Sequence, residues 1–188
     1  PLYSNRCLEK RERRMKYFLL KTDPQFDTAP IINGWFQKID RRNIRVGKSH
    51  NIEKRQLFFI ESNPITVFPD VLSFPAFMVT EQLRDVIRLY EPKMLFKEIV
   101  LLDQKYAKAC TYHLPILDYI DCLTDGSILT KDRSTIISAE IDPNKMNEHS
   151  IAYIASVSNL YTIARLDIVE SFLRRGVQGI SLTDIKQI

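Results

Sequence analysis

The segment 160–183, LYTIARLDIVESFLRRGVQGISLT, carries signals that restrict it to a strand, a helix and a second strand. Asp167 is placed to cap the helix, with Glu170 three residues later in a capping-box arrangement, because both carboxylates can accept from backbone N–H groups that lack helical partners. Gly176 can take the left-handed conformation that ends a helix. Apolar residues recur on one face at helical spacing, at Ile168, Val169, Phe172 and Leu173. The segment therefore predicts a helix packed on a sheet, without a recognisable reactive group.

A second unit of the same design lies upstream, in residues 77–102, FMVTEQLRDVIRLYEPKMLFKEIVLL. Thr80 is expected to be its N-cap, and Pro92 prevents continuation because proline lacks an N–H and clashes with the preceding turn. The predicted buried stripe consists of Leu83, Val86, Ile87 and Tyr90. Leu89 lies off this stripe, so we expect it to be exposed.

The rest of the chain reads as short strands separated by turns, with strong breaks at Asn33-Gly34 and at several prolines. The expected extended segments are residues 16–21, 56–61, 99–102, 112–117, 134–141 and 151–157. Strand signals outnumber helices, which predicts an α+β fold with a mainly antiparallel sheet and a few short helices. A chain of 188 residues with 45% hydrophobic content can bury a sizeable core, and we expect a single domain.

Positive charge is concentrated at the N-terminus. Residues 1–14 hold five basic and two acidic side chains, a net charge of +3, so the remainder contributes only +1 to the chain total of +4. We expect residues 1–14 to be a basic extension outside the fold, with Met15 as the biological start, and residues 15–188 to form the domain. The alternative is a basic arm that binds nucleic acid or acidic lipid.

Four motifs around the two helices carry a family resemblance. These are FPDVLSFP, FMVTEQLRDVIRLY, IVLLD and RLDIVESFLRRGVQGI, in that order. Together they resemble the eleventh family of immunity proteins of bacterial polymorphic toxin systems, formerly a domain of unknown function. The likeness covers roughly Met15 to Ile188 in order of elements. It implies a cytoplasmic protein that binds and neutralises a cognate toxin, and it supplies no catalytic or cofactor-binding residues.

Metal and redox chemistry find little support in the sequence. The histidines have no metal-type spacing, there is no Cys-x-x-Cys, and no glycine-rich phosphate loop occurs. The cysteines, Cys7, Cys110 and Cys122, are odd in number and widely spaced, which argues against a disulfide framework and fits a reducing compartment. No 20-residue stretch is apolar enough to span a bilayer. We therefore expect no metal, cofactor or membrane partner, and no enzymatic activity.

Two clusters of side chains leave a small enzyme as the alternative function. Cys110 and His113 could be imagined as a nucleophile and a base, but positions i and i+3 of a strand point to opposite faces. Asp118, Asp121 and Asp125 could hold magnesium if their segment were helical, whereas a solvated turn is the simpler interpretation. A small phosphoester-acting enzyme would use His113, Asp118 and Asp121.

The partner-binding candidates are Trp35, Arg41, Arg42 and Leu89. Trp35 follows a turn and could be a half-exposed anchor, since aromatic residues contribute much of the energy of small binding patches. The alternative is a core tryptophan with Phe36 on the opposite face. Arg41 and Arg42 belong to the basic run 40–48, which could meet an acidic partner surface, face nucleic-acid phosphates, or be a solvated loop. Of these partners a toxin is expected and nucleic acid is not.

Overall fold

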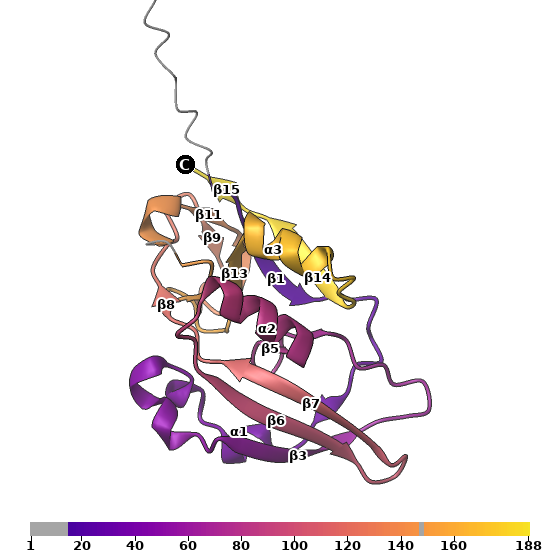
Figure 1. The fold of residues 1–188 in the computed structure, drawn as a ribbon. Helices are drawn as coiled ribbons and strands as arrows, with labels where there is room; N and C mark the ends of the chain where they lie inside the picture. The colour runs from indigo at the N-terminus through magenta and orange to yellow at the C-terminus, as the bar shows by residue number, and fades with distance from the viewer. Residues whose placement is uncertain (1–14, 147–148) are drawn as a thin grey trace, which may run out of the picture.

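Two β-sheets, each with one longer α-helix packed against it, form most of the computed structural model, which describes residues 15–146 and 149–188 (Figure 1). The first sheet has the order β2 (Ile31–Ile32), β3 (Arg55–Glu61), β6 (Phe96–Asp103), β7 (Lys108–Pro115), β5 (Met78–Val79) and β4 (Val71–Leu72). The second has the order β14 (Ile180–Asp184), β1 (Tyr17–Thr22), β13 (Thr162–Arg165), β12 (Ile151–Ile154) and β8 (Tyr119–Ile120).

Smaller elements complete the described fold. Two short ladders pair β9 (Ile128–Leu129) with β10 (Ile136–Ser138), and β11 (Glu140–Ile141) with β15 (Lys186–Gln187). The α-helices are α1 (Trp35–Lys38), α2 (Glu81–Tyr90) and α3 (Leu166–Leu173), and the 3₁₀-helices are η1 (Arg41–Asn43), η2 (Val46–Asn51) and η3 (Pro143–Met146). Most strand pairs are antiparallel, and the parallel ones are β3 with β6, β8 with β12, and β11 with β15. The predicted single-domain α+β class is confirmed.

The two helix units expected from the sequence share one topology. In the first, β5 and β6 lie on either side of β7 and run antiparallel to it, and α2 connects them. In the second, β13 and β14 lie on either side of β1, and α3 connects them. Because both outer strands oppose the same middle strand, they are parallel to each other and need a helical crossover. The strand, helix and strand predicted for each unit are confirmed.

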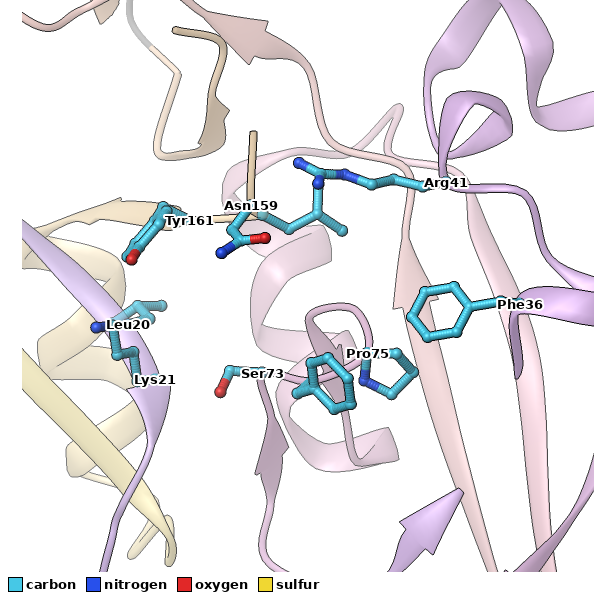
Figure 2. Close-up of a pocket in the computed structure, with 10 residues that line it drawn as sticks. Leu20, Lys21, Phe36, Arg41, Ser73, Pro75, Asn159 and Tyr161 are labelled. Carbon is cyan, nitrogen blue, oxygen red and sulfur yellow. The ribbon is translucent and has the colours of Figure 1, made fainter. Parts of the chain in front are cut away.

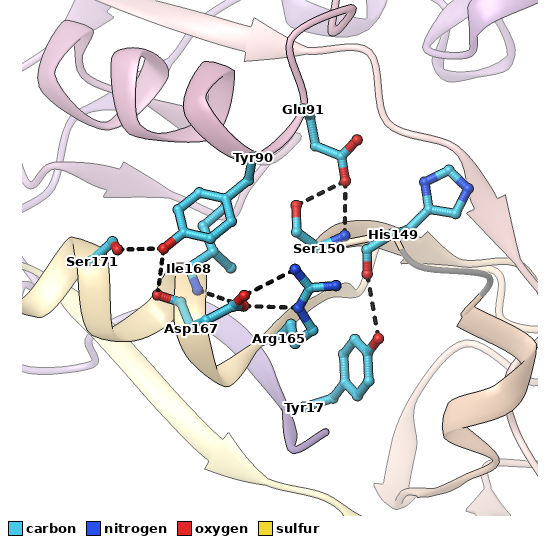
Figure 3. Close-up of polar contacts among 9 residues, drawn as sticks. All are labelled: Tyr17, Tyr90, Glu91, His149, Ser150, Arg165, Asp167, Ile168 and Ser171. Carbon is cyan, nitrogen blue, oxygen red and sulfur yellow. Dashed lines mark hydrogen bonds and ion pairs between the residues drawn. The ribbon is translucent and has the colours of Figure 1, made fainter. Parts of the chain in front are cut away.

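The predicted capping box at Asp167 is wrong. The N-cap of α3 is Arg165, two residues before Asp167, and its side chain makes no cap hydrogen bond; the helix begins at Leu166. Asp167 lies inside the first turn, where its Oδ1 accepts from Arg165 Nε at 2.8 Å and from the backbone N of Ile168 at 2.9 Å (Figure 3). The Glu170 carboxylate lies 3.4 Å from an arginine one turn later, not at the helix start. The chain passes directly from β13 into α3, so no separate cap residue is available.

The helix α2 agrees more closely with its prediction. Thr80 is the N-cap, although its hydroxyl donates to Asp70 Oδ1 at 3.0 Å and not to the helix. Three of the four residues of the predicted stripe are buried, and the fourth, Tyr90, is half-buried. Leu89 is 70% exposed. Gly176, after α3, has a φ of 69°, the left-handed conformation predicted for it.

The two helices hold the two units together (Figure 3). The Tyr90 hydroxyl at the end of α2 lies 2.6 Å from Ser171 Oγ and donates to the carbonyl of Asp167 at 3.0 Å, both on α3. Next to it, the Glu91 carboxylate accepts from both the backbone N and the hydroxyl of Ser150 at 2.8 Å. Polar side chains at one end of α2 therefore fix α3 and the start of β12.

The predicted basic extension, residues 1–14, lies outside the described residues. Within 15–146 and 149–188, no helix combines the length and the apolar character that crossing a bilayer requires.

Candidate partner-binding groove

A groove lies where β1, the segment after β4, α1 and the loop before β13 meet (Figure 2). Its volume is about 260 Å³, below the ~300–1,000 Å³ typical of small-molecule sites. The size suits inserted side chains better than a cofactor. The lining residues are Leu20, Lys21, Phe36, Arg41, Ser73, Phe74, Pro75, Asn159, Leu160 and Tyr161.

The helix α1 sends one aromatic ring inward and the next outward. Trp35 is 2% exposed and stacks on Phe58 of β3, with ring centroids 5.0 Å apart. Phe36, its neighbour, is 68% exposed and lines the groove. The prediction that Trp35 is an exposed anchor is therefore wrong, because stacking on Phe58 places its indole in the core. The alternative, a core tryptophan with Phe36 on the opposite face, is correct.

A second aromatic ring reaches the groove from the connection between β4 and β5. Phe74 is 76% exposed, and its ring meets Phe36 edge to face with centroids 6.3 Å apart. Its neighbour Ser73 is fixed to β1, because the backbone N of Ser73 donates to Thr22 Oγ1 at 2.8 Å and the backbone N of Thr22 donates to Ser73 Oγ at 3.1 Å. The exposed ring thus stands on an anchored backbone.

Two cations enter the groove from different walls, Lys21 from β1 and Arg41 from η1 (Figure 2). Lys21 Nζ lies 5.0 Å from the centroid of the Tyr161 ring, a cation–π distance. Among the described residues, neither cation forms an ion pair with a carboxylate. The lining residues include no acid, so the groove presents positive charge beside aromatic surface.

Two other arginines of the basic run 40–48 have partners of their own. Arg42 donates to both carboxylate oxygens of Asp40, and this hydrogen bonding lowers the pKa of Asp40 to about 2. Arg45 places its guanidinium 4.9 Å from the centroid of the Tyr119 ring. Of the two predicted arginines, the structure brings only Arg41 to the groove. Leu89, on α2, does not line it.

Cys110 and His113 both lie in β7, three positions apart, where side chains point to opposite faces of the sheet. His113 is buried, with its Nε2 3.3 Å from Arg84 Nη1. Burial lowers the pKa of His113, and burial also raises the pKa of the Cys110 thiol. A thiol with a raised pKa is a poor nucleophile near neutral pH, because the thiolate is the reactive form.

The three aspartates after β7 have separate surroundings. Asp121 accepts from the hydroxyl of Ser156, and Asp118 Oδ2 lies 3.9 Å from His149 Nδ1. Asp125 is exposed in the turn before β9. In the part of the chain that the structure describes, no group of three or more His, Cys, Asp or Glu side chains could hold a metal ion. The segment forms the short strand β8 and turns, so the helical spacing needed for a shared site is absent there.

Two groove residues, Lys21 and Phe74, were not singled out by sequence reasoning. Phe74 belongs to a proline-punctuated loop, and Lys21 ends a predicted strand. Neither position carries a local signal, because their proximity to Phe36 and Arg41 depends on how the two sheets meet. No protein-family model matches this chain, and no curated protein matches it in sequence.

Proposed function

We propose that this chain is an immunity protein that neutralises a toxin by stoichiometric binding, and that the groove between the sheets is the centre of its contact surface. The observation that carries the proposal is the exposed pair Phe36 and Phe74, held beside two cations without carboxylate partners. Removing large aromatic side chains from water lowers the free energy of the system. An exposed pair of such rings therefore indicates a surface that a partner covers.

The composition of the groove matches the anchors found in protein interfaces. Aromatic and arginine side chains contribute most of the binding energy in such surfaces. Phe36 and Phe74 supply the aromatic anchors, and Arg41 supplies the guanidinium. Because Ser73 is bonded to β1 and Trp35 is buried, little ordering of these anchors is needed on binding, and a preorganised surface loses less entropy.

Binding without chemistry is supported by what lines the groove. Its side chains include no Asp, Glu, His or Cys that could act as a general base or nucleophile near neutral pH. A cytoplasmic site of action agrees with Cys110 and Cys122, both free thiols, because disulfides are rare in reducing compartments. The resemblance of the two helix units to an immunity family names the class of partner, a toxin made by the same cell.

The proposal is tested by co-expressing the chain with the toxin encoded beside its gene. We expect a complex of fixed 1:1 composition on size-exclusion chromatography with light scattering. Toxin activity should fall in proportion to added protein and vanish at equimolar amounts, with both masses unchanged by mass spectrometry. Inactivation by substoichiometric amounts, or a covalent change in the toxin or its product, would replace binding with catalysis.

A further inference from the structure

We propose that the groove receives an acidic segment of the partner, with a bulky apolar side chain against Phe36 and Phe74 and carboxylates on either side bound by Lys21 and Arg41. The proposal depends on the proposed function only for the identity of the partner. The chemistry of the segment follows from the side chains that line the groove.

Charge complementarity determines that the bound segment carries negative charge. Lys21 and Arg41 enter from different walls and have no carboxylate partner among the described residues (Figure 2). The nearest acid in sequence to Arg41 is Asp40, which is occupied by Arg42 through both oxygens. A guanidinium binds a carboxylate well because its planar N–H groups match the two oxygens. Carboxylates on the partner would therefore give Lys21 and Arg41 the ion pairs that the described part of the chain does not give them.

The apolar part of the occupant follows from the rings. Phe74 and Phe36 expose faces and edges beside Pro75, which gives an inserted aromatic or aliphatic side chain apolar contact on more than one side. Asn159 adds an exposed amide that has no hydrogen-bond partner among residues 15–146 and 149–188. An amide can both donate and accept, so it suits the backbone of an extended peptide.

A peptide fits these features better than a nucleic acid. Binding of nucleic acid draws on many phosphate contacts and therefore on a dense basic surface. Outside residues 1–14 the chain has a net charge of only +1. Arg42, which could extend the basic surface, is paired with Asp40.

The test uses three defined probes against the full chain. The first is a capped pentapeptide with one phenylalanine between two pairs of glutamates, the second has lysines in place of the glutamates, and the third is a single-stranded oligothymidine. Each is titrated while methyl and aromatic NMR signals are followed. We expect the acidic peptide alone to bind, with its largest shifts at residues 36, 74 and 160.

Single substitutions test whether the acidic peptide binds in the groove. Arg41→Ala and Phe74→Ala should each weaken the acidic peptide about tenfold, which corresponds to about 1.4 kcal/mol. Matched controls are Lys48→Ala, an exposed cation outside the groove, and Ile65→Ala, an apolar side chain that is 69% exposed. Neither control should change the affinity. All four positions are at the surface or partly exposed, and unchanged amide spectra would confirm that each variant folds.

Several results would overturn the inference. These are no shifts with the acidic peptide, equal binding of the lysine peptide, tighter binding of the oligothymidine at the same residues, or equal losses in groove and control variants. None of them bears on whether a toxin forms a complex with the chain, which the co-expression experiment measures separately. An intact toxin complex without any peptide binding in the groove would place the interface elsewhere, so neutralisation by binding would stand and the groove as its centre would not.

Discussion

The rings of Phe36 and Phe74 meet edge to face with their centroids 6.3 Å apart, although each side chain is more than two-thirds exposed. Phe36 belongs to α1, whose other aromatic residue, Trp35, is fixed in the core, and Phe74 follows Ser73, which is bonded to β1. The two rings are therefore held by separate parts of the fold. Their pairing creates a rigid aromatic edge that neither segment could present alone.

The contact between α2 and α3 predicts a loss of stability in Tyr90→Phe. This change removes the hydroxyl that bonds to Asp167 and Ser171. The free energy of unfolding should fall by about 1 kcal/mol, measured by urea denaturation. Tyr106→Phe is the control, because the Tyr106 hydroxyl has no hydrogen bond among the described residues. Equal effects of the two changes would show that the helix contact contributes nothing.

Asp70 links the two units more directly. Its carboxylate accepts from Thr80 Oγ1 at 3.0 Å and from the backbone N of Gln178 at 2.7 Å. Asp70→Ala should lower the free energy of unfolding by about 1.5–3 kcal/mol, because it removes two hydrogen bonds to a charged acceptor. Thr80→Val removes only the hydroxyl contact and should cost about 1 kcal/mol. Thermal or urea unfolding would compare them, and a larger loss in Thr80→Val would contradict the assignment.

Two glycines near the end of α3 provide a matched pair. Gly176 and Gly179 have φ values of 69° and 75°, where a side chain is strained. A Cβ at Gly176 would meet nothing within 4 Å, whereas at Gly179 it would collide with Pro69. Gly176→Ala should cost about 1–2 kcal/mol, and Gly179→Ala about 1–3 kcal/mol more through overpacking. Similar melting temperatures for the two variants would mean that the Pro69 contact is not as tight as described.

His113 predicts a pH dependence of stability. Burial lowers the pKa of His113 in the folded chain, so below about pH 6.5 the unfolded chain binds a proton that the folded chain resists. Stability should therefore fall as pH decreases from about 6.5 toward the lowered folded pKa. Urea denaturation between about pH 7 and 5 should show a steeper loss in the natural chain than in His113→Gln. Parallel pH profiles would contradict the prediction.

Helical periodicity and the helix-ending glycine were better guides to the elements than to the contacts between them, and the capping box at Asp167 was not a reliable signal. The stripe of α2 and the left-handed Gly176 follow from local rules, and both are confirmed. The predicted strand at 134–141 instead divides into β10 and β11, which pair with different partners. The predicted strand at 112–117 begins earlier, because β7 pairs with β6 along its whole length from Lys108. Strand ends depend on such nonlocal pairing, which a single sequence does not display.

The candidate site was predictable only in part. Arg41 was among the sequence candidates and lies in the groove. Trp35 could be an exposed anchor or a core residue from the sequence, because a four-residue helix has no periodicity to decide its buried face. Phe74 was missed, since nothing near it in the chain indicates that β1 and α1 would lie beside it. Arg42 and Leu89 stay untested as contacts outside the groove.

The measurement that tests the central claim most directly is toxin binding by the double variant Phe36→Ala/Phe74→Ala, by isothermal titration calorimetry. The natural chain should bind its toxin at a 1:1 ratio with a Kd near the nanomolar range, about −12 kcal/mol. The double variant should fold normally and bind at least about a hundredfold more weakly, a loss of about 3 kcal/mol expected for two anchors. A correctly folded double variant that binds and neutralises the toxin as well as the natural chain would contradict the claim that this groove is the contact surface.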